Sequence, residues 1–154
     1  STNYTMVYFV LYGCYFMEPK KFEILEHKAD LKIRVFGKIK EELFQNALLG
    51  MSESMKSEAR RTEEKIRREI KIKSLDLPSL LVDFLSEVIY LSQTNQEVYF
   101  EVKFKKFSDT ELEAELFGQK VERFGEDIKA VTYHGLDVHQ KKDGTWEATV
   151  LFDI

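Results

Sequence analysis

LPSLLVDFLSEVIYLSQTNQEVYFEVKF (Leu77–Phe104) is the stretch that decides the fold, because its hydrophobic period changes partway along. Its first half carries apolar residues around well over half of a helix, which predicts a buried helix that ends near Ser92. Asp76 precedes this helix as a candidate N-cap, and Pro78 is tolerated in a first helical turn. The second half alternates apolar and polar residues, which is the period of a strand.

The chain after this stretch has the pattern of β-strands. The alternation of residues 98–104, a turn at 108–109 and a second alternation over 112–116 predict a hairpin. Residues 118–126 are expected to form a loop. A strand is expected from Ile128 to Val138, with a bulge near His134 and Gly135. Asp143 and Gly144 form a strong hairpin-turn signal, and a last strand is expected from Thr145 to Ile154.

The chain before this stretch adds three strands and one helix. Short strands are expected at 22–26 and 31–36, the second ending at Gly37, and a helical period begins at Ile39. The later part of the charged segment 57–73 reads as a strand with one solvated face. The order ββαβαββββ lacks regular βαβ alternation. It therefore predicts an α+β fold with two helices packed on largely antiparallel β-sheet.

The composition is that of an ordinary soluble protein. The chain has 154 residues, enough for one domain with a real core. The net charge of −4, from 23 basic and 27 acidic residues, is too balanced to indicate a nucleic-acid-binding protein. Cys14 is the only cysteine, which excludes an intrachain disulfide and a zinc-finger framework. We expect a cytoplasmic protein in a reducing environment.

The first 16 residues form an apolar, Tyr-rich leader. Its core, Met6–Phe16, is shorter than the roughly 20 residues that span a bilayer, and no basic residue precedes it as in a signal peptide. No membrane partner is expected. Met17 follows directly, so residues 1–16 are either a non-native leader before a start at Met17 or an extra edge or interface strand. Residues 17–154 are expected to form the single domain.

Two carboxylates adjoin at the end of the last strand, on Asp153 and at the C-terminus of Ile154. Carboxylates held side by side make half of a site for a hard cation. Asp30 lies at a strand start, where it serves either as a turn cap or as a ligand. His27 lies three residues earlier. A single histidine in this position is more often a structural residue that bonds a backbone carbonyl.

Other polar residues carry weaker signals. Lys129 begins a strand, where a lysine is usually a solvated charge. The spacing of His134 and His139 does not suit zinc. Asp83 and Glu87 are an i,i+4 pair expected on a solvent-facing stripe. No nucleophile motif or Gly-rich phosphate loop is present.

The basic segment Arg60–Lys73 is a further candidate site. Its Arg and Lys side chains could contact RNA phosphates. Its interleaved glutamates favour a solvated surface.

Five sequence runs together resemble the archease family, and they cover the chain from Lys21 onward. They are EILEHKAD (Glu23–Asp30), EEL…NA (Glu41–Ala47), LLVDFLSEVIYL (Leu80–Leu91), IKAVTYH (Ile128–His134) and the terminal FDI (Phe152–Ile154). Lys28 replaces the threonine, and Leu31 the following Ile or Val, of the family's HTAD motif. Arg123 or Phe124 lies where the family often has a histidine, so no role is carried over to that loop.

The resemblance implies a non-enzymatic activator of the 3′-phosphate RNA ligase that seals tRNA exons. Such activators promote guanylylation and multiple turnover of the ligase, so tRNA would be reached only through the ligase. The residues that match the family's metal site are Asp30, Asp153 and Ile154, and Lys129 matches a lysine tied to activity. His27 would lie in the surroundings of the metal. The expected ion is Ca²⁺, with Mg²⁺ or Mn²⁺ as alternatives, and a homo-oligomer is an open option.

Elementary chemistry agrees with such a site. Up to three anionic oxygen donors suit a hard cation rather than a soft metal, and without a cation they would repel one another. The main alternative is a chaperone-like or RNA-binding module that acts through Arg60–Lys73. A third alternative, a metal-dependent hydrolase at Asp30 and Asp153, lacks an evident base or nucleophile.

Overall fold

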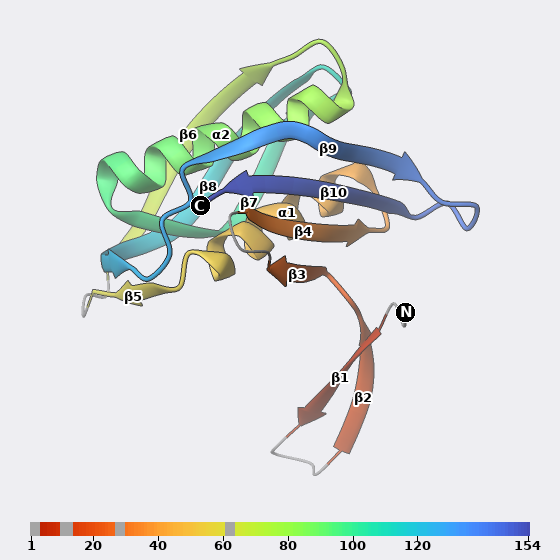
Figure 1. The fold of residues 1–154 in the computed structure, drawn as a ribbon, viewed down its shortest axis with the longest axis horizontal. Helices are drawn as coiled ribbons and strands as arrows, with labels where there is room; N and C mark the ends of the chain where they lie inside the picture. Colours follow the sequence, from red (N-terminus) through yellow and green to blue (C-terminus); the bar gives the residue numbers. More distant parts are fainter. Residues whose placement is uncertain (1–3, 10–13, 27–29, 61–63) are drawn as a thin grey trace.

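The computed structural model describes residues 4–9, 14–26, 30–60 and 64–154. The described chain contains two helices and ten strands (Figure 1). In chain order they are β1 (Tyr4–Phe9), β2 (Cys14–Pro19), β3 (Phe22–Glu26), β4 (Asp30–Gly37), α1 (Lys40–Ser54), β5 (Ser57–Ala59), β6 (Lys65–Lys73), α2 (Leu77–Asn95), β7 (Glu97–Phe107), β8 (Glu111–Phe124), β9 (Ala130–Gln140) and β10 (Trp146–Asp153).

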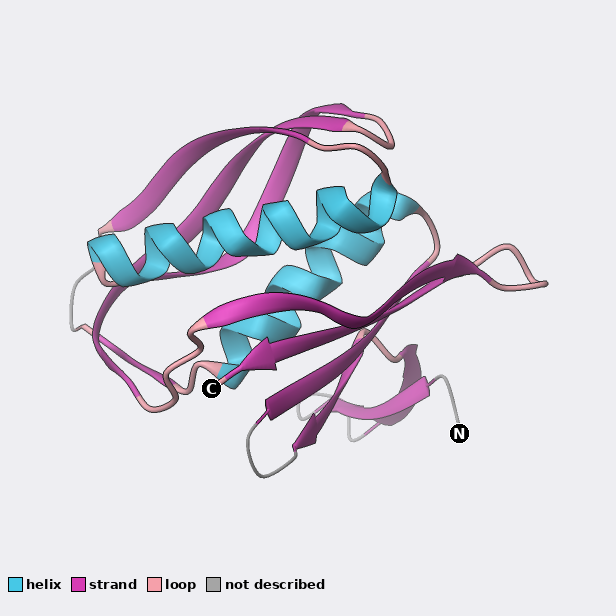
Figure 2. Cartoon of the chain, turned by 45° about the horizontal axis from the view of Figure 1, so that its top comes forward, coloured by secondary structure: helices cyan, strands magenta, loops and turns pink. Residues whose placement is uncertain are grey.

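Two antiparallel sheets enclose the two helices. The first sheet has the strand order β3-β4-β10-β9. The second is built around β8, which pairs with β6, β7 and the short β5. Helix α1 contacts β4 and β7, and α2 contacts β9, β6 and β7, so each helix touches both sheets (Figure 2). The expected α+β fold with two helices on antiparallel sheet is confirmed, and the helices form its middle layer.

The core follows from the periodicities of the elements. On β4, Leu31, Ile33 and Val35 alternate inward, and each is at most 3% exposed. On α2, Asp76 caps the N-terminus by accepting the Ser79 N–H at 2.8 Å. The helix ends at Asn95, about one turn beyond the expected Ser92, where Gln96 adopts a left-handed conformation with φ 52°.

The expected loop over residues 118–126 is wrong for most of its length. Strand β8 continues to Phe124, and only then does the chain turn at Gly125. Gly118 lies opposite Tyr99, where β7 shifts its register, and a Cβ atom at Gly118 would collide with the carbonyl oxygen of Val98. This glycine therefore permits a close approach of two backbones inside a strand, rather than marking a loop.

The register shift after Tyr99 is a β-bulge, and it changes which side chains of β7 face the core. The alternation predicts that Val98 and Phe100 face inward. Val98 is fully buried as expected, but Tyr99 is fully buried as well and Phe100 is only half-buried. The Gln45 side chain of α1 holds the irregular backbone, because it donates to the Phe100 carbonyl at 2.9 Å and accepts the Val102 N–H at 2.7 Å.

The bulge that was expected near His134 and Gly135 is confirmed. The pairing of β9 with β10 shifts its register between Thr149 and Leu151, opposite this part of β9, and Gly135 has φ +66°. The bulge lets the two halves of β9 both pair with β10. The turn at Asp143 and Gly144 is also present, with φ +89° at Gly144.

Strands β1 and β2 are formed by the leader together with residues 17–19, which were expected to belong to the main domain. Strands β1 and β2 pair antiparallel with each other in a separate two-stranded sheet, and neither is paired with β3 among the described strands. This hairpin projects from the body of the molecule (Figure 1). In the described part of the chain, neither helix has the length and apolar character that a bilayer crossing requires.

Candidate functional site

Asp30 and Asp153 lie directly opposite each other on neighbouring strands. They form the last cross-strand pair of β4 and β10 at that end of the first sheet. Their neighbours Leu31 and Phe152 are buried, so both carboxylates lie on the outer face of the sheet. The Cβ atoms of such directly opposed residues lie about 4.5–5.5 Å apart. Two carboxylates 123 positions apart in sequence are thereby brought together.

A third strand brings Lys129 to the same end of the sheet. Its backbone N–H donates to the carbonyl oxygen of Asp153 at 2.8 Å, just before β9 begins. Its side chain is exposed and makes no ion pair with any residue that the structure describes. Ile154 is half-buried against the core and directly follows Asp153. His27, expected near the site, lies outside the described residues.

Asp30 has one oxygen without a partner. Its Oδ1 atom is buried and accepts no hydrogen bond from the described residues. A buried carboxylate oxygen that lacks a donor or a counter-ion is costly. A divalent cation would relieve this cost, and the oxygen donors present are those that Ca²⁺ or Mg²⁺ prefers. Among the described side chains no group of three His, Cys, Asp or Glu is gathered, so Ile154 or water would complete the site.

Asp83 is not part of a solvent-facing stripe, contrary to expectation. It accepts hydrogen bonds from Ser74 Oγ at 2.5 Å and from the Tyr133 hydroxyl at 3.2 Å. Partial burial, and then the negative charge of Asp83, raise the pKa of Tyr133. The aspartate thus ties α2 to β9, the strand that follows Lys129.

The two histidines of β9 make local contacts. His134 donates its backbone N–H to Thr132 Oγ1 at 3.2 Å. His139 Nδ1 lies 2.7 Å from Asp137 and its Nε2 lies 3.3 Å from Glu147. These contacts belong to the solvated face of the first sheet.

Sequence reasoning missed a buried charged cluster in the second sheet. Glu97 is fully buried and binds the Arg68 guanidinium through both oxygens, at 2.6 and 3.0 Å. The Tyr99 hydroxyl and Lys120 Nζ, the latter at 3.2 Å, complete its partners. Burial acts to raise the pKa of Glu97, but hydrogen bonds from Arg68, Tyr99 and Lys120 outweigh it and hold this pKa below its usual range. A glutamate at a strand start gives no sequence signal of such burial.

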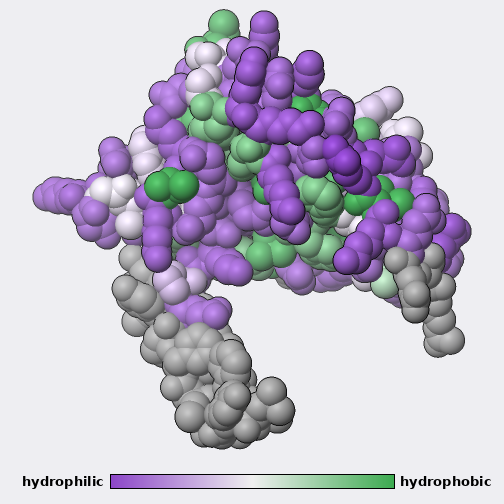
Figure 3. All heavy atoms as spheres, turned by 180° about the vertical axis from the view of Figure 1, so that it is seen from behind, coloured by the Kyte–Doolittle hydropathy of each residue, from purple (hydrophilic) through white to green (hydrophobic). Residues whose placement is uncertain are grey.

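Ion pairs neutralise much of the basic segment Arg60–Lys73. Among the described residues, four of its cations pair with glutamates of β7 and β8, namely Arg60–Glu122 at 3.2 Å, Arg67–Glu115 at 2.6 Å, Arg68–Glu97 at 2.6 Å and Lys71–Glu113 at 3.7 Å. Seen from behind, the surface is mainly hydrophilic, with apolar residues in separate spots (Figure 3). The segment therefore presents a surface of mixed charge.

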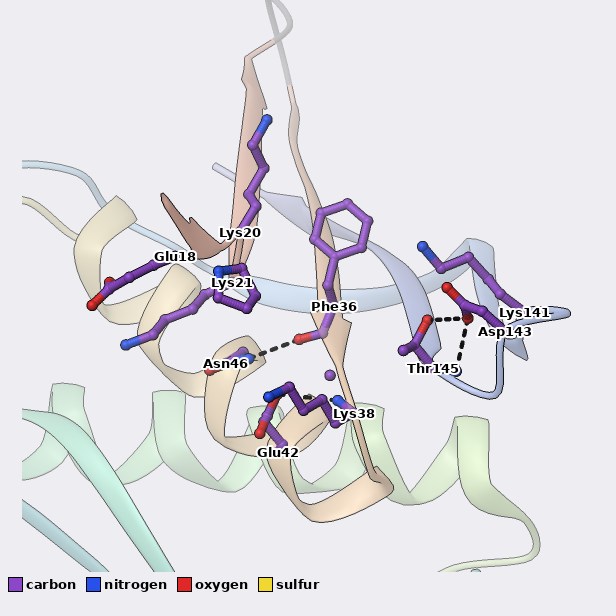
Figure 4. A pocket seen from close by; sticks show the side chains of 12 residues that line it. Glu18, Lys20, Lys21, Phe36, Lys38, Glu42, Asn46, Lys141, Asp143 and Thr145 are labelled. Carbon is purple, nitrogen blue, oxygen red and sulfur yellow. Dashed lines mark hydrogen bonds between the residues drawn. The ribbon is translucent and has the colours of Figure 1, made fainter. Parts of the chain in front are cut away.

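A groove lies at the opposite end of the first sheet from Asp30 and Asp153. It has a volume of about 630 Å³ and is formed by the end of β2, β4, α1 and the turn between β9 and β10 (Figure 4). Lys141 lies 5.3 Å from the centre of the Phe36 ring, and Asn46 donates to the Phe36 carbonyl at 2.7 Å. No site residue expected from the sequence lines this groove.

Known proteins resemble the chain over nearly its whole length. The sequence model of the Archease protein family (MTH1598/TM1083) matches residues 22–154. The archease of Methanosarcina barkeri is 38% identical over 145 residues, which cover 89% of this chain and 98% of that protein. The archease of Pyrococcus abyssi is 32% identical over 142 residues, with 88% and 99% covered.

Solved structures have the same fold. The solution structure of Methanobacterium thermoautotrophicum protein 1598 has a TM-score of 0.60 at 31% identity, covering 86% of this chain and 98% of that one. A crystal structure of a Thermotoga maritima archease, described as a possible chaperone, has a TM-score of 0.62 at 22% identity, with 84% and 94% covered. The family match and the identities agree with each other, and the chain belongs to the archease family.

Proposed function

We propose that this protein is a non-catalytic activator of the 3′-phosphate RNA ligase of tRNA splicing and RNA repair. It would promote ligase guanylylation and multiple turnover through a cation held at Asp30 and Asp153. The observation that carries the proposal is the buried, unpartnered Oδ1 of Asp30 directly across from Asp153. Membership of the archease family supports the same activity.

Each residue has a distinct role in this proposal. The side chains of Asp30 and Asp153 and the main-chain carboxyl group of Ile154 would hold the ion, Ca²⁺ in the first place and Mg²⁺ or Mn²⁺ as alternatives. The bound ion would supply positive charge for phosphate oxygens at the mouth of the ligase active site. Lys129, fixed by its backbone bond to Asp153, would present an ammonium group at the same end of the sheet.

Ligation at limiting ligase tests this proposal. Wild-type protein is expected to raise the number of RNA molecules sealed per ligase, and Asp30→Asn is expected to lose most of this effect while keeping the side-chain shape. Glu101→Gln, a change on the outer face of the second sheet, serves as the matched control and is expected to stimulate normally. Full stimulation by Asp30→Asn would refute the role of the site.

A second experiment addresses Ile154. One glycine added after this residue moves the terminal carboxylate while leaving the strand intact. We expect weaker Ca²⁺ binding and weaker stimulation of the ligase. Unchanged values for both would remove the carboxylate of Ile154 from the mechanism.

The alternative of an RNA-binding module is less well supported. Its basic segment is largely paired with glutamates, so fewer cations are free to neutralise phosphates. Under the activator proposal, tRNA is reached through the ligase, and the isolated protein binds RNA weakly. Tight binding with a steep salt dependence would favour the alternative. The cytoplasmic location and a homo-oligomeric state remain predictions.

A further inference from the structure

The groove at the far end of the first sheet is lined by several lysines. They are Lys20, Lys21, Lys38 and Lys141 (Figure 4). Gly37, which also lines the groove, follows Asp30 by seven positions on β4. At roughly 3.4 Å per residue, this places the groove about 24 Å from the acidic end. A ligand in the groove therefore leaves the acidic end free for a partner protein.

Three of these lysines are available to an anion. Lys21, Lys38 and Lys141 make no ion pair with any residue that the structure describes. Lys20, in contrast, binds Glu23 at 2.6 Å. A lysine ammonium group binds phosphate oxygens as a point charge. The groove thus offers three cations to an anionic ligand.

Three carboxylates also line the groove, and two of them are engaged by neighbouring groups. Glu42 of α1 accepts a backbone N–H just before the helix at 3.0 Å. Asp143 accepts the N–H and the hydroxyl of Thr145 at 2.9 and 2.6 Å. These hydrogen bonds are the main cause that lowers the pKa of Asp143, and the charge of Lys141 adds a smaller part. The third carboxylate, that of Glu18, belongs to an exposed residue.

An asparagine and an aromatic ring add two further features to the groove. Asn46 is 6% exposed, and its amide donates to the Phe36 carbonyl at 2.7 Å. Its Oδ1 atom accepts no hydrogen bond from the described residues but, unlike Oδ1 of Asp30, keeps accessible surface. Because Asn46 lines the groove, this oxygen is an acceptor that a ligand hydroxyl can reach. The half-buried Phe36 ring adds aromatic surface, and Lys141 Nζ lies 5.3 Å from its centre.

We propose that this groove binds single-stranded RNA, with phosphates at the lysines, a base at Phe36 and a ribose 2′-hydroxyl at Asn46. A cationic groove beside an aromatic side chain suits a single strand, because its phosphates bind the cations and its unpaired bases stack on the ring. A duplex keeps its bases stacked on one another and so cannot use the ring. The Asn46 oxygen favours RNA over DNA, since only RNA carries a 2′-hydroxyl donor.

The size of the groove and its charge agree with this ligand. Its volume of about 630 Å³ lies within the range of about 300–1,000 Å³ for small-molecule sites, which suits one nucleotide of a strand. Three cations give modest affinity, in agreement with weak binding of RNA by the isolated protein. That this RNA is the ligase's substrate rests on the proposed function. The protein would then hold RNA at one end of the sheet and the ligase at the other.

A titration of labelled hexauridylate with the full chain, followed by fluorescence anisotropy, tests the groove without the ligase. Three phosphate contacts predict a slope of about −2 for log K against log salt, at about −0.7 per contact on a single strand. The double variant Lys38→Gln with Lys141→Gln should reduce this slope to about −0.7 and weaken binding at low salt about tenfold. Lys103→Gln is the matched control, because Lys103 Nζ also lies over a phenylalanine ring, at 5.0 Å on the second sheet. It should bind as wild type does.

Two further comparisons test the base and the sugar contacts. Phe36→Leu is expected to weaken binding about tenfold, because the base loses its stacking surface. Hexadeoxyuridylate should bind the wild-type protein about fivefold more weakly than hexauridylate, as for the loss of one hydrogen bond. Urea unfolding of each variant checks that the fold is retained.

Several outcomes would overturn the proposal. Wild-type affinity and slope in the double lysine variant would exclude the groove, and an equal loss in Lys103→Gln would place the RNA on the second sheet. Equal binding of the two hexamers would refute the preference for RNA. If uridine monophosphate bound as tightly as hexauridylate, the occupant would be a free nucleotide instead of a strand.

Multiple-turnover ligation separates this inference from the proposed function. We expect the double lysine variant to raise the KM for RNA about fivefold, while stimulation at saturating RNA stays near the wild-type value. Asp30→Asn should lose stimulation at every RNA concentration. If the lysine variant keeps the wild-type KM and RNA affinity while Asp30→Asn is inactive, the groove is refuted and the function stands. If wild-type protein does not stimulate the ligase, the proposed function fails, and the anisotropy titration still decides on the groove.

Discussion

Replacing Arg68 by methionine would leave Glu97 buried without its main counter-charge. Removing one partner of a buried ion pair costs about 3–5 kcal/mol, because the remaining charge stays out of water. Here Lys120 at 3.2 Å and the Tyr99 hydroxyl remain as partners of Glu97. The Arg68 side chain is also 39% exposed, so part of its attraction to Glu97 is screened. We therefore expect Arg68→Met to lower the free energy of unfolding by about 2–3 kcal/mol.

Urea unfolding at neutral pH, followed by circular dichroism, measures this loss. Arg67→Met provides the matched control, because Arg67 is 56% exposed and its pair with Glu115 lies on the solvated face. That change should cost no more than about 1 kcal/mol. The double variant Arg68→Met with Glu97→Gln should recover part of the loss, since the buried charge is then removed. An Arg68→Met protein as stable as Arg67→Met would refute the reasoning.

Three further predictions concern pH, packing and metal binding. Because the folded-state pKa of Glu97 is lowered, its ionised form stabilises the folded protein at pH values above the unfolded-state pKa of about 4.3. This stabilisation is lost as the pH falls through the lower folded-state pKa, so the difference in unfolding free energy between wild type and Glu97→Gln should shrink below about pH 4 in acid-unfolding experiments. Gly118→Ala should lower the free energy of unfolding by about 1–3 kcal/mol in urea, because its Cβ would force the Val98 backbone away, and a neutral effect would contradict the close approach. Ca²⁺ at 100 times its dissociation constant should add about 2.7 kcal/mol of stability by thermal unfolding, and Asp30→Asn should abolish the gain; equal gains in both proteins would exclude Asp30 as a ligand.

The regular parts of the fold could be predicted from sequence because each has one clear period. The buried stripe of α2 and the inward alternation of β4 each read directly from apolar spacing. The position where β8 ends could not be predicted, because a glycine such as Gly118 usually indicates a loop. Its role in the strand is evident only once the β7 backbone that lies against it is known. Similarly, Tyr99 and Phe100 exchange their expected environments because of a bulge that depends on pairing with β8.

Only part of the acidic site could be predicted from the local sequence. The position of Asp153 at the end of an alternating run marks it as a candidate ligand, whereas the sequence around Asp30, taken alone, favours a turn cap. Their pairing depends on the order of strands in the sheet, which local patterns do not encode. Glu97 was missed because its significance comes from burial among residues of other elements. A residue of this kind can be recognised only once the elements that pack around it are known.

The position of β10 between β4 and β9 has a consequence for biosynthesis. This strand is made last among those described, yet it occupies an interior position of its sheet. While a ribosome is still making it, β4 and β9 each expose an unpaired edge, which is an opportunity for wrong pairing. Insertion of β10 closes both edges and, in the same step, sets Asp153 against Asp30. The acidic pair is therefore assembled only in a chain that has completed its folding, so nascent or truncated molecules would not present it to a partner.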